Sequence, residues 1–107
     1  MILKYDIDID NQKICDRIKQ LINLIYKLLP IREEDGDWRS LLSTIMEEIA
    51  GIYRLIPLDY QSELFVLLSK LEGLFSLTEE NDFFNFRRTV FECLNLMNKV
   101  REHVSNG

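Results

Sequence analysis

Apolar residues recur at steps of three and four through four successive segments of this sequence. The segments span about 11–29, 38–56, 59–76 and 79–104. Because an α-helix turns once in about 3.6 residues, this spacing places each apolar set in one stripe along a helix. Four such helices joined by short loops bury their stripes most simply by packing together. The sequence therefore predicts an all-α fold, an antiparallel four-helix bundle.

The length of the chain allows one domain. It has 107 residues, of which 47% are hydrophobic and 29% charged, a composition typical of a folded globular protein. Single domains commonly have roughly 100–150 residues, and a second core here would leave neither half enough buried surface. We therefore expect one helical domain, 1–107, without internal repeats.

Polar and apolar residues alternate strictly near the start of the chain. The apolar residues are Leu3, Tyr5, Ile7 and Ile9, and the polar residues are Lys4, Asp6, Asp8 and Asp10. A period of two is typical of a half-buried strand, and no later segment offers a matching strand. We therefore expect a short extended N-terminal arm, 1–10, that lies across the helices or pairs with the same arm of a second chain. This interpretation favours a homodimer.

Prolines, glycines and small polar residues predict where the helices end. Pro30 should end the first helix and Pro57 the second, because proline lacks an amide proton and disfavours helix in the preceding residue. A loop is expected at 31–36. The candidate N-cap residues are Asp10, Asp37, Asp59 and, before the last helix, either Ser76 in a Ser-x-x-Glu pattern with Glu79 or Thr78. Gly51 and Gly73 fall inside predicted helices, where we expect each to permit close backbone approach or a kink.

Few residues in the sequence suit catalysis or metal binding. Its single histidine, His103, excludes both the glutamate and histidine di-metal centres of helical bundles and the nucleophile systems that require histidine. Cys15 and Cys93 lie far apart without a neighbouring cysteine, so we expect buried free thiols rather than a disulfide or a zinc site. The sequence thus predicts no catalytic, cofactor-binding or metal-binding residues.

One set of carboxylates suggests an alternative function. Glu47-Glu48 followed by Glu79-x-x-Asp82 resembles the Glu-Glu-x-x-Glu and Glu-x-x-Asp pattern of MazG-like all-α nucleotide pyrophosphohydrolases. The resemblance covers only these residues, and Gly51 stands where the pattern has its third glutamate. It implies Mg²⁺-dependent hydrolysis of nucleoside triphosphates, with these four carboxylates holding the metal.

Charge and hydropathy limit the location of the protein. The longest uninterrupted apolar run, 64–68, is too short to cross a bilayer. The first ten residues lack the basic and apolar regions of a secretory signal. We therefore expect a cytoplasmic protein without membrane contact.

The acidic balance of the sequence argues against nucleic-acid binding. The net charge is −5 and the sequence pI is about 4.8, whereas a nucleic-acid surface is usually basic. The segments 11–29 and 83–107 are locally cationic, but Phe83, Phe84 and Phe86 look like core residues rather than free stacking platforms. An acidic decoy that occupies a nucleic-acid-binding surface is compatible with this charge but is not suggested by it.

The apolar content of the two C-terminal helices exceeds one stripe per helix. Phe65, Val66, Phe84 and Phe91 extend beyond the predicted stripes. Either the helix at 59–76 is enclosed on both sides by its own chain, or the excess forms an intermolecular interface. The predicted interaction surface consists of Phe65, Phe84, Arg87, Arg88 and Phe91. The function expected from the sequence is that of a small non-enzymatic helical interaction or adaptor protein that self-associates and binds a protein partner.

Overall fold

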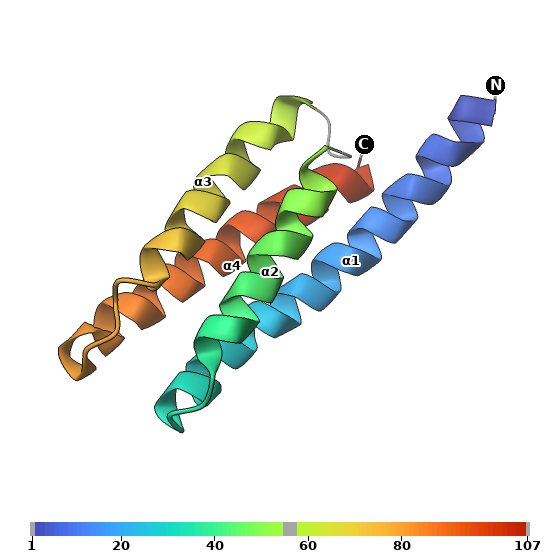
Figure 1. Cartoon of the computed structure of the whole chain (residues 1–107). Coiled ribbons are helices and arrows are strands. Elements are labelled where there is room, and N and C mark those ends of the chain that lie inside the picture. Colours follow the sequence, from blue (N-terminus) through green and yellow to red (C-terminus); the bar gives the residue numbers. More distant parts are fainter. Residues whose placement is uncertain (1, 55–57, 107) are drawn as a thin grey trace.

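The computed structural model describes the backbone of residues 2–54 and 58–106 and the side chains of residues 12–54 and 61–105. The elements are α1 (Ile2–Glu33), α2 (Trp38–Tyr53), α3 (Leu58–Leu74), the short 3-10 helix η1 (Glu80–Asp82) and α4 (Phe83–Asn106). The four α-helices run alternately up and down in one bundle (Figure 1). This confirms the predicted all-α four-helix fold.

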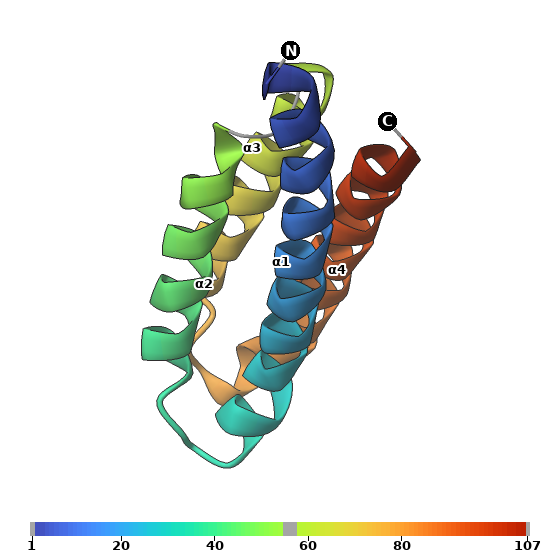
Figure 2. The ribbon, with the colours of Figure 1, turned by 90° about the vertical axis from the view of Figure 1, so that its right-hand side faces the viewer.

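The helices form a ring in which each packs against two others. Helix α1 lies between α2 and α4, and α3 completes the ring by packing against α2 and α4 (Figure 2). Each helix therefore keeps one side towards solvent. The expectation that the helix at 59–76 is enclosed on both sides is wrong, because Phe65 and Val66 of α3 are 63% and 43% exposed.

The apolar stripes of all four helices meet in one core. Its fully buried large side chains are Phe86, Ile18, Leu21, Ile25, Leu28, Leu42, Ile45, Ile49, Leu64, Leu67, Leu71 and Leu74. No polar or charged residue is buried among the described side chains. Removal of this apolar surface from water, at about 25 cal/mol per Å², is the main force that holds the helices together.

The N-terminal segment is helical rather than extended. Helix α1 begins at Ile2, so the predicted arm at 1–10 and the predicted N-cap Asp10 are both wrong. An isolated strand would leave its backbone amides and carbonyls unpaired, whereas a helix pairs them within the segment. This requirement outweighs the alternation of side chains, and the dimer inferred from arm pairing loses that support.

Helix α1 also continues past the proline that was expected to end it. Pro30 lies inside α1, which ends at Glu33. The last turn is held by tertiary contacts, because Ile31 packs against the core and Arg32 hydrogen-bonds to the opposite turn of the bundle. Packing of this kind commonly decides where a helix ends when local preference points elsewhere.

The turn between α1 and α2 is tight and depends on Gly36. The Gly36 amide donates to the Ile31 carbonyl at 2.7 Å, which brings the two backbones together. A Cβ at Gly36 would lie 2.8 Å from Ile31 Cγ2 and 3.1 Å from the Ile31 carbonyl oxygen. Asp35 precedes it with a positive φ of 57°, a conformation that aspartate tolerates better than most residues.

Asp37 caps α2, as predicted. Its carboxylate accepts hydrogen bonds from the Ser40 hydroxyl at 2.7 Å and from the Ser40 amide at 3.1 Å. These two bonds lower the pKa of Asp37 below its usual value of 3.8, and the bond from the hydroxyl has the larger effect. Helix α2 ends at Tyr53; the predicted end at Ile56, with Pro57, lies outside the described residues.

The turn between α3 and α4 is built differently from the prediction. Helix α3 begins at Leu58, one residue before the predicted cap Asp59, and ends at Leu74. The Ser76 hydroxyl donates to the Gly73 carbonyl at 2.8 Å, so Ser76 closes α3 instead of capping the following helix. The Glu79 amide donates to Asp82 Oδ2 at 3.3 Å across η1, and α4 begins only at Phe83.

Arg32 joins the two turns at this end of the bundle. Its Nη2 donates to the carbonyls of Leu77 at 2.8 Å and Glu79 at 2.9 Å. Its Cζ lies 4.5 Å from the ring centroid of Phe86, 5.2 Å from that of Phe83 and 5.8 Å from that of Trp38.

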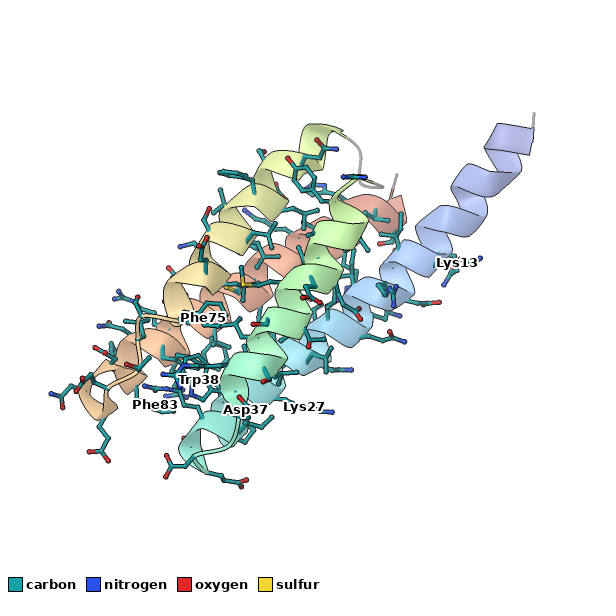
Figure 3. The ribbon with its side chains drawn as sticks, viewed as in Figure 1. Lys13, Lys27, Asp37, Trp38, Phe75 and Phe83 are labelled. Atoms are coloured by element: carbon teal, nitrogen blue, oxygen red, sulfur yellow. The ribbon has the colours of Figure 1, made fainter. Side chains whose placement is uncertain are left out.

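The rings around Arg32 come from different parts of the chain. Figure 3 shows Trp38 and Phe83 at this end, with Phe75 beside Trp38. The Trp38 and Phe86 rings meet edge to face, with centroids 5.1 Å apart. This cluster holds the start of α2 and the start of α4 on the end of α1.

Glycine substitutions should separate the required glycine from the dispensable ones. A Cβ built at Gly51 or Gly73 has no neighbouring heavy atom within 4 Å, so the predicted close backbone approach is wrong. We expect Gly51→Ala and Gly73→Ala each to raise the free energy of unfolding by up to about 0.5–1 kcal/mol. Gly36→Ala should lower it by about 1 kcal/mol or more. Urea denaturation followed by circular dichroism measures all three, and a stabilised Gly36→Ala variant would contradict this account.

Substitution of Arg32 should show the importance of the guanidinium group. Arg32→Lys keeps the charge but cannot serve two carbonyls while stacking on the rings, so we expect a loss of about 1–3 kcal/mol in the free energy of unfolding. The control is Arg39→Lys, because exposed Arg39 stacks on Trp38 at 4.9 Å. We expect that control to lose less than about 1 kcal/mol. Equal losses in urea denaturation would refute a special role for Arg32.

Candidate interaction surface

Three exposed aromatic rings lie where α1 and α4 meet the solvent. Phe84 is 72% exposed, Tyr26 50% and Phe91 38%. The Tyr26 and Phe91 rings meet edge to face, with centroids 6.2 Å apart. The Cζ of Arg87 lies 5.5 Å from the Phe91 ring centroid. We call these four residues, Tyr26, Phe84, Arg87 and Phe91, the aromatic face.

Helix geometry explains why these residues of α4 lie together. Phe84, Arg87 and Phe91 are separated by three and four positions, which places them in one stripe along α4. The contact between Tyr26 and Phe91 shows that this stripe runs beside α1. The aromatic face therefore bridges two helices that the core already holds rigidly.

The structure brings together only part of the predicted interaction surface. Phe84, Arg87 and Phe91 share one stripe, and Arg88 is exposed on the same helix. Phe65 lies elsewhere, on the outer side of α3. Lys70 of α3 pairs with Glu92 at 3.5 Å, so α3 borders a different side of α4 from the one that contacts Tyr26.

Tyr26 was not among the predicted interaction residues. It falls outside the apolar stripe of the first helix, and an aromatic residue off the stripe of an amphipathic helix is the sequence signal for it. Phe84 is 72% exposed, as a residue of the predicted interaction surface should be and contrary to its comparison with core residues. Phe86 is fully buried, as predicted, and Phe83 is half-buried.

The carboxylates of the hydrolase-like pattern do not converge. Glu48 Oε2 lies 3.6 Å from Arg17 Nη1, beside an open groove of about 540 Å³ between α1 and α2 that Glu47 also lines. Asp82 instead binds the Glu79 amide in the turn before α4. No three histidine, cysteine, aspartate or glutamate side chains gather as a metal site within the described residues.

The remaining reactive side chains lie apart from the aromatic face. His103 is half-buried, with Nε2 3.9 Å from Glu63 Oε1 of α3. Cys93 is fully buried, and desolvation raises the pKa of its thiol to about 12. Cys15 is half-buried, so the expectation of two buried free thiols holds fully only for Cys93.

Comparisons with known proteins found no match to any protein family, curated protein or solved structure. Within residues 2–54 and 58–106, no helix combines the length and apolarity needed to cross a lipid bilayer. The surface itself, rather than a relative, must therefore support any assignment of function.

Thiol labelling should distinguish the two cysteines. The nucleophile is the thiolate, so a thiol whose pKa is raised to about 12 and whose side chain is buried should not react at pH 8 in the folded protein. We expect Ellman's reagent to titrate one thiol in the native protein and both in denaturant. Cys15→Ser should remove the native signal and Cys93→Ser should keep it. Rapid labelling of Cys93 in the native protein would show that this part of the core opens readily.

Proposed function

We propose that the protein is a small non-enzymatic interaction protein that binds another protein through the aromatic face of α1 and α4. The observation that carries this proposal is the exposed pair of rings, Tyr26 and Phe91, where α1 meets α4, with exposed Phe84 in the same stripe of α4 as Phe91. Single exposed apolar residues are common on protein surfaces, but adjacent exposed rings from two elements are characteristic of binding sites.

The composition of the aromatic face supports this proposal. Aromatic residues and arginine are enriched at protein interfaces, and tyrosine and arginine are frequent among the residues that dominate binding energy. Arg87 stacks on Phe91, and the Phe91 ring meets that of Tyr26. These contacts hold the side chains in place, so less conformational entropy is lost when a partner binds.

Self-association remains a prediction from the sequence. A homodimer is one way to cover these rings, and a different protein is another. A stable interface usually buries about 800 Å² on each partner, so the aromatic face would form its centre rather than its whole area. Neighbouring exposed residues such as Arg88 would form the polar rim.

A library of random peptides tests the proposal whichever protein the partner is. We expect selection of displayed random peptides on the purified protein to yield binders that are lost with Phe84→Ser plus Phe91→Ser. The variant should remain folded, because both side chains are exposed. Binding is measured by biolayer interferometry, and folding by circular dichroism.

Phe65→Ser provides a matched control. Phe65 is exposed to a similar extent as Phe84 but lies on α3, away from the aromatic face. We expect peptides selected on the wild type to bind Phe65→Ser with unchanged affinity. Selected peptides that bind the double variant as tightly as the wild type, or that depend on Phe65 instead, would refute the proposal.

A further inference from the structure

The charges of this acidic protein are strongly segregated along its sequence. Residues 12–33 and 83–106, which belong to α1 and α4, contain nine lysines or arginines and four aspartates or glutamates, a net charge of +5. Residues 34–82 contain three lysines or arginines and eleven aspartates or glutamates, a net charge of −8. Residues 1–11 contain one lysine and three aspartates, a net charge of −2, which completes the total of −5. The net charge therefore hides a cationic half, residues 12–33 and 83–106, and a more strongly anionic remainder.

The fold turns this sequence asymmetry into a spatial one. Helices α1 and α4 are neighbours in the ring, so their cationic segments lie on the same side of the bundle (Figure 2). Helices α2 and α3 pack together on the other side; of the eleven acidic residues in 34–82, five lie on these two helices and six in the turns at 34–37 and 79–82. The aromatic face lies at the junction of the two cationic helices.

Several exposed cations belong to the two helices that form the aromatic face. Arg87 is part of it, and Arg88 follows on α4. On α1, Lys19 precedes Tyr26 by seven positions and therefore lies in the same stripe, and Lys27 projects away from the bundle (Figure 3).

Four carboxylates also belong to this half. They are Asp16, Glu33, Glu92 and Glu102. Glu92 pairs with Lys70 of α3 and so adds little charge to the aromatic face. Cations therefore outnumber carboxylates nine to four in these two segments, while the acidic residues Glu79, Glu80 and Asp82 lie in the turn just before Phe84.

We propose that the aromatic face binds an acidic amphipathic segment of a partner protein, with large apolar residues on one side and aspartate or glutamate beside them. This inference rests on the proposed function and specifies its partner by chemistry. The apolar residues of the segment cover Phe84, Phe91 and Tyr26, and its carboxylates meet Arg87 and Arg88. A helix laid along the junction of α1 and α4 places both kinds of contact at once.

A second copy of the chain fits the aromatic face less well. In a symmetric dimer the same patch meets itself, so Arg87 and Arg88 would oppose the cationic half of the partner. Like charges brought together across an interface cost free energy and slow association. The charge distribution therefore favours a different, acidic partner for this face.

A nucleic acid fits the charge pattern less well than a short acidic segment. Electrostatic interactions are screened over about 8 Å at physiological ionic strength, and the bundle is 21 by 18 Å in its two smaller dimensions. A short segment on the aromatic face is therefore influenced mainly by the cationic half. A long polyanion would also approach the acidic residues of 34–82 and be repelled.

Defined peptides test this inference by fluorescence anisotropy. The probes are a labelled amphipathic peptide of about five helical turns made of leucine, alanine and glutamate, and versions with glutamine or lysine in place of glutamate. An oligothymidylate of similar length represents nucleic acid. At low salt we expect the glutamate peptide to bind at least about tenfold more tightly than the glutamine peptide, and the difference to shrink as salt is raised.

Charge reversal identifies the face that selects the acidic probe. Arg87→Glu with Arg88→Glu should weaken binding of the glutamate peptide at least about tenfold and weaken binding of the glutamine peptide much less. Arg39→Glu with Arg54→Glu changes the net charge equally but alters exposed residues of α2 and its C-cap. We expect this control to retain the affinity for the glutamate peptide.

The outcomes separate this inference from the proposed function. Equal binding of the glutamate and glutamine peptides, both lost with Phe84→Ser plus Phe91→Ser, would overturn the acidic partner and leave the interaction surface intact. Tighter binding of oligothymidylate than of the glutamate peptide would also overturn the inference. So would sedimentation showing a dimer that the Phe84→Ser and Phe91→Ser double variant abolishes. If no library or defined peptide depends on the aromatic face, the proposed function fails as well.

Discussion

The guanidinium group of Arg32 joins the two turns at one end of the bundle. Its two hydrogen bonds reach the carbonyls of Leu77 and Glu79, while its flat surface lies close to the rings of Trp38, Phe83 and Phe86. A planar cation can donate hydrogen bonds along its edge while its flat surface stacks on rings. Without this donor, the two carbonyls of the half-buried turn would need water as their hydrogen-bond partner. This residue belongs to the end of α1 past Pro30 and contacts the start of α4.

The aromatic face follows from the ring arrangement of the helices. Because each helix packs against two others, the four stripes close one core and leave four outer sides. Tyr26 and Phe91 lie at the edge of the α1 and α4 contact, where the rings meet each other but remain open to solvent. The same adjacency collects the cationic residues of α1 and α4. Apolar surface and positive charge therefore occur together, which supports an acidic amphipathic partner.

The bundle was predictable because its signal is repeated many times along each helix. The N-cap Asp37 and the core residue Phe86 were likewise correct, since each depends on a local pattern or on a stripe. The predicted arm and the predicted helix end at Pro30 were wrong. In the arm, the alternation of side chains competed with the need to pair backbone amides and carbonyls. At Pro30, the local effect of proline competed with tertiary packing, which a sequence pattern does not show. Of the residues predicted for an interaction surface, Phe84, Arg87 and Phe91 share one stripe of α4 and Phe65 lies on α3; Tyr26, which meets Phe91, was not among them.

The sequence by itself determined that the chain forms four helices with one buried stripe each, because helical periodicity and the gain from burying apolar surface are properties of the residues alone. It also determined that the charges are unevenly divided among the segments. Only the tertiary structure decided which helices are neighbours. That choice brought Tyr26 beside Phe91, moved Phe65 to another side and gathered the cations of α1 and α4. Contacts between residues distant in the chain depend on the packing of whole helices, which the pattern within one helix does not specify.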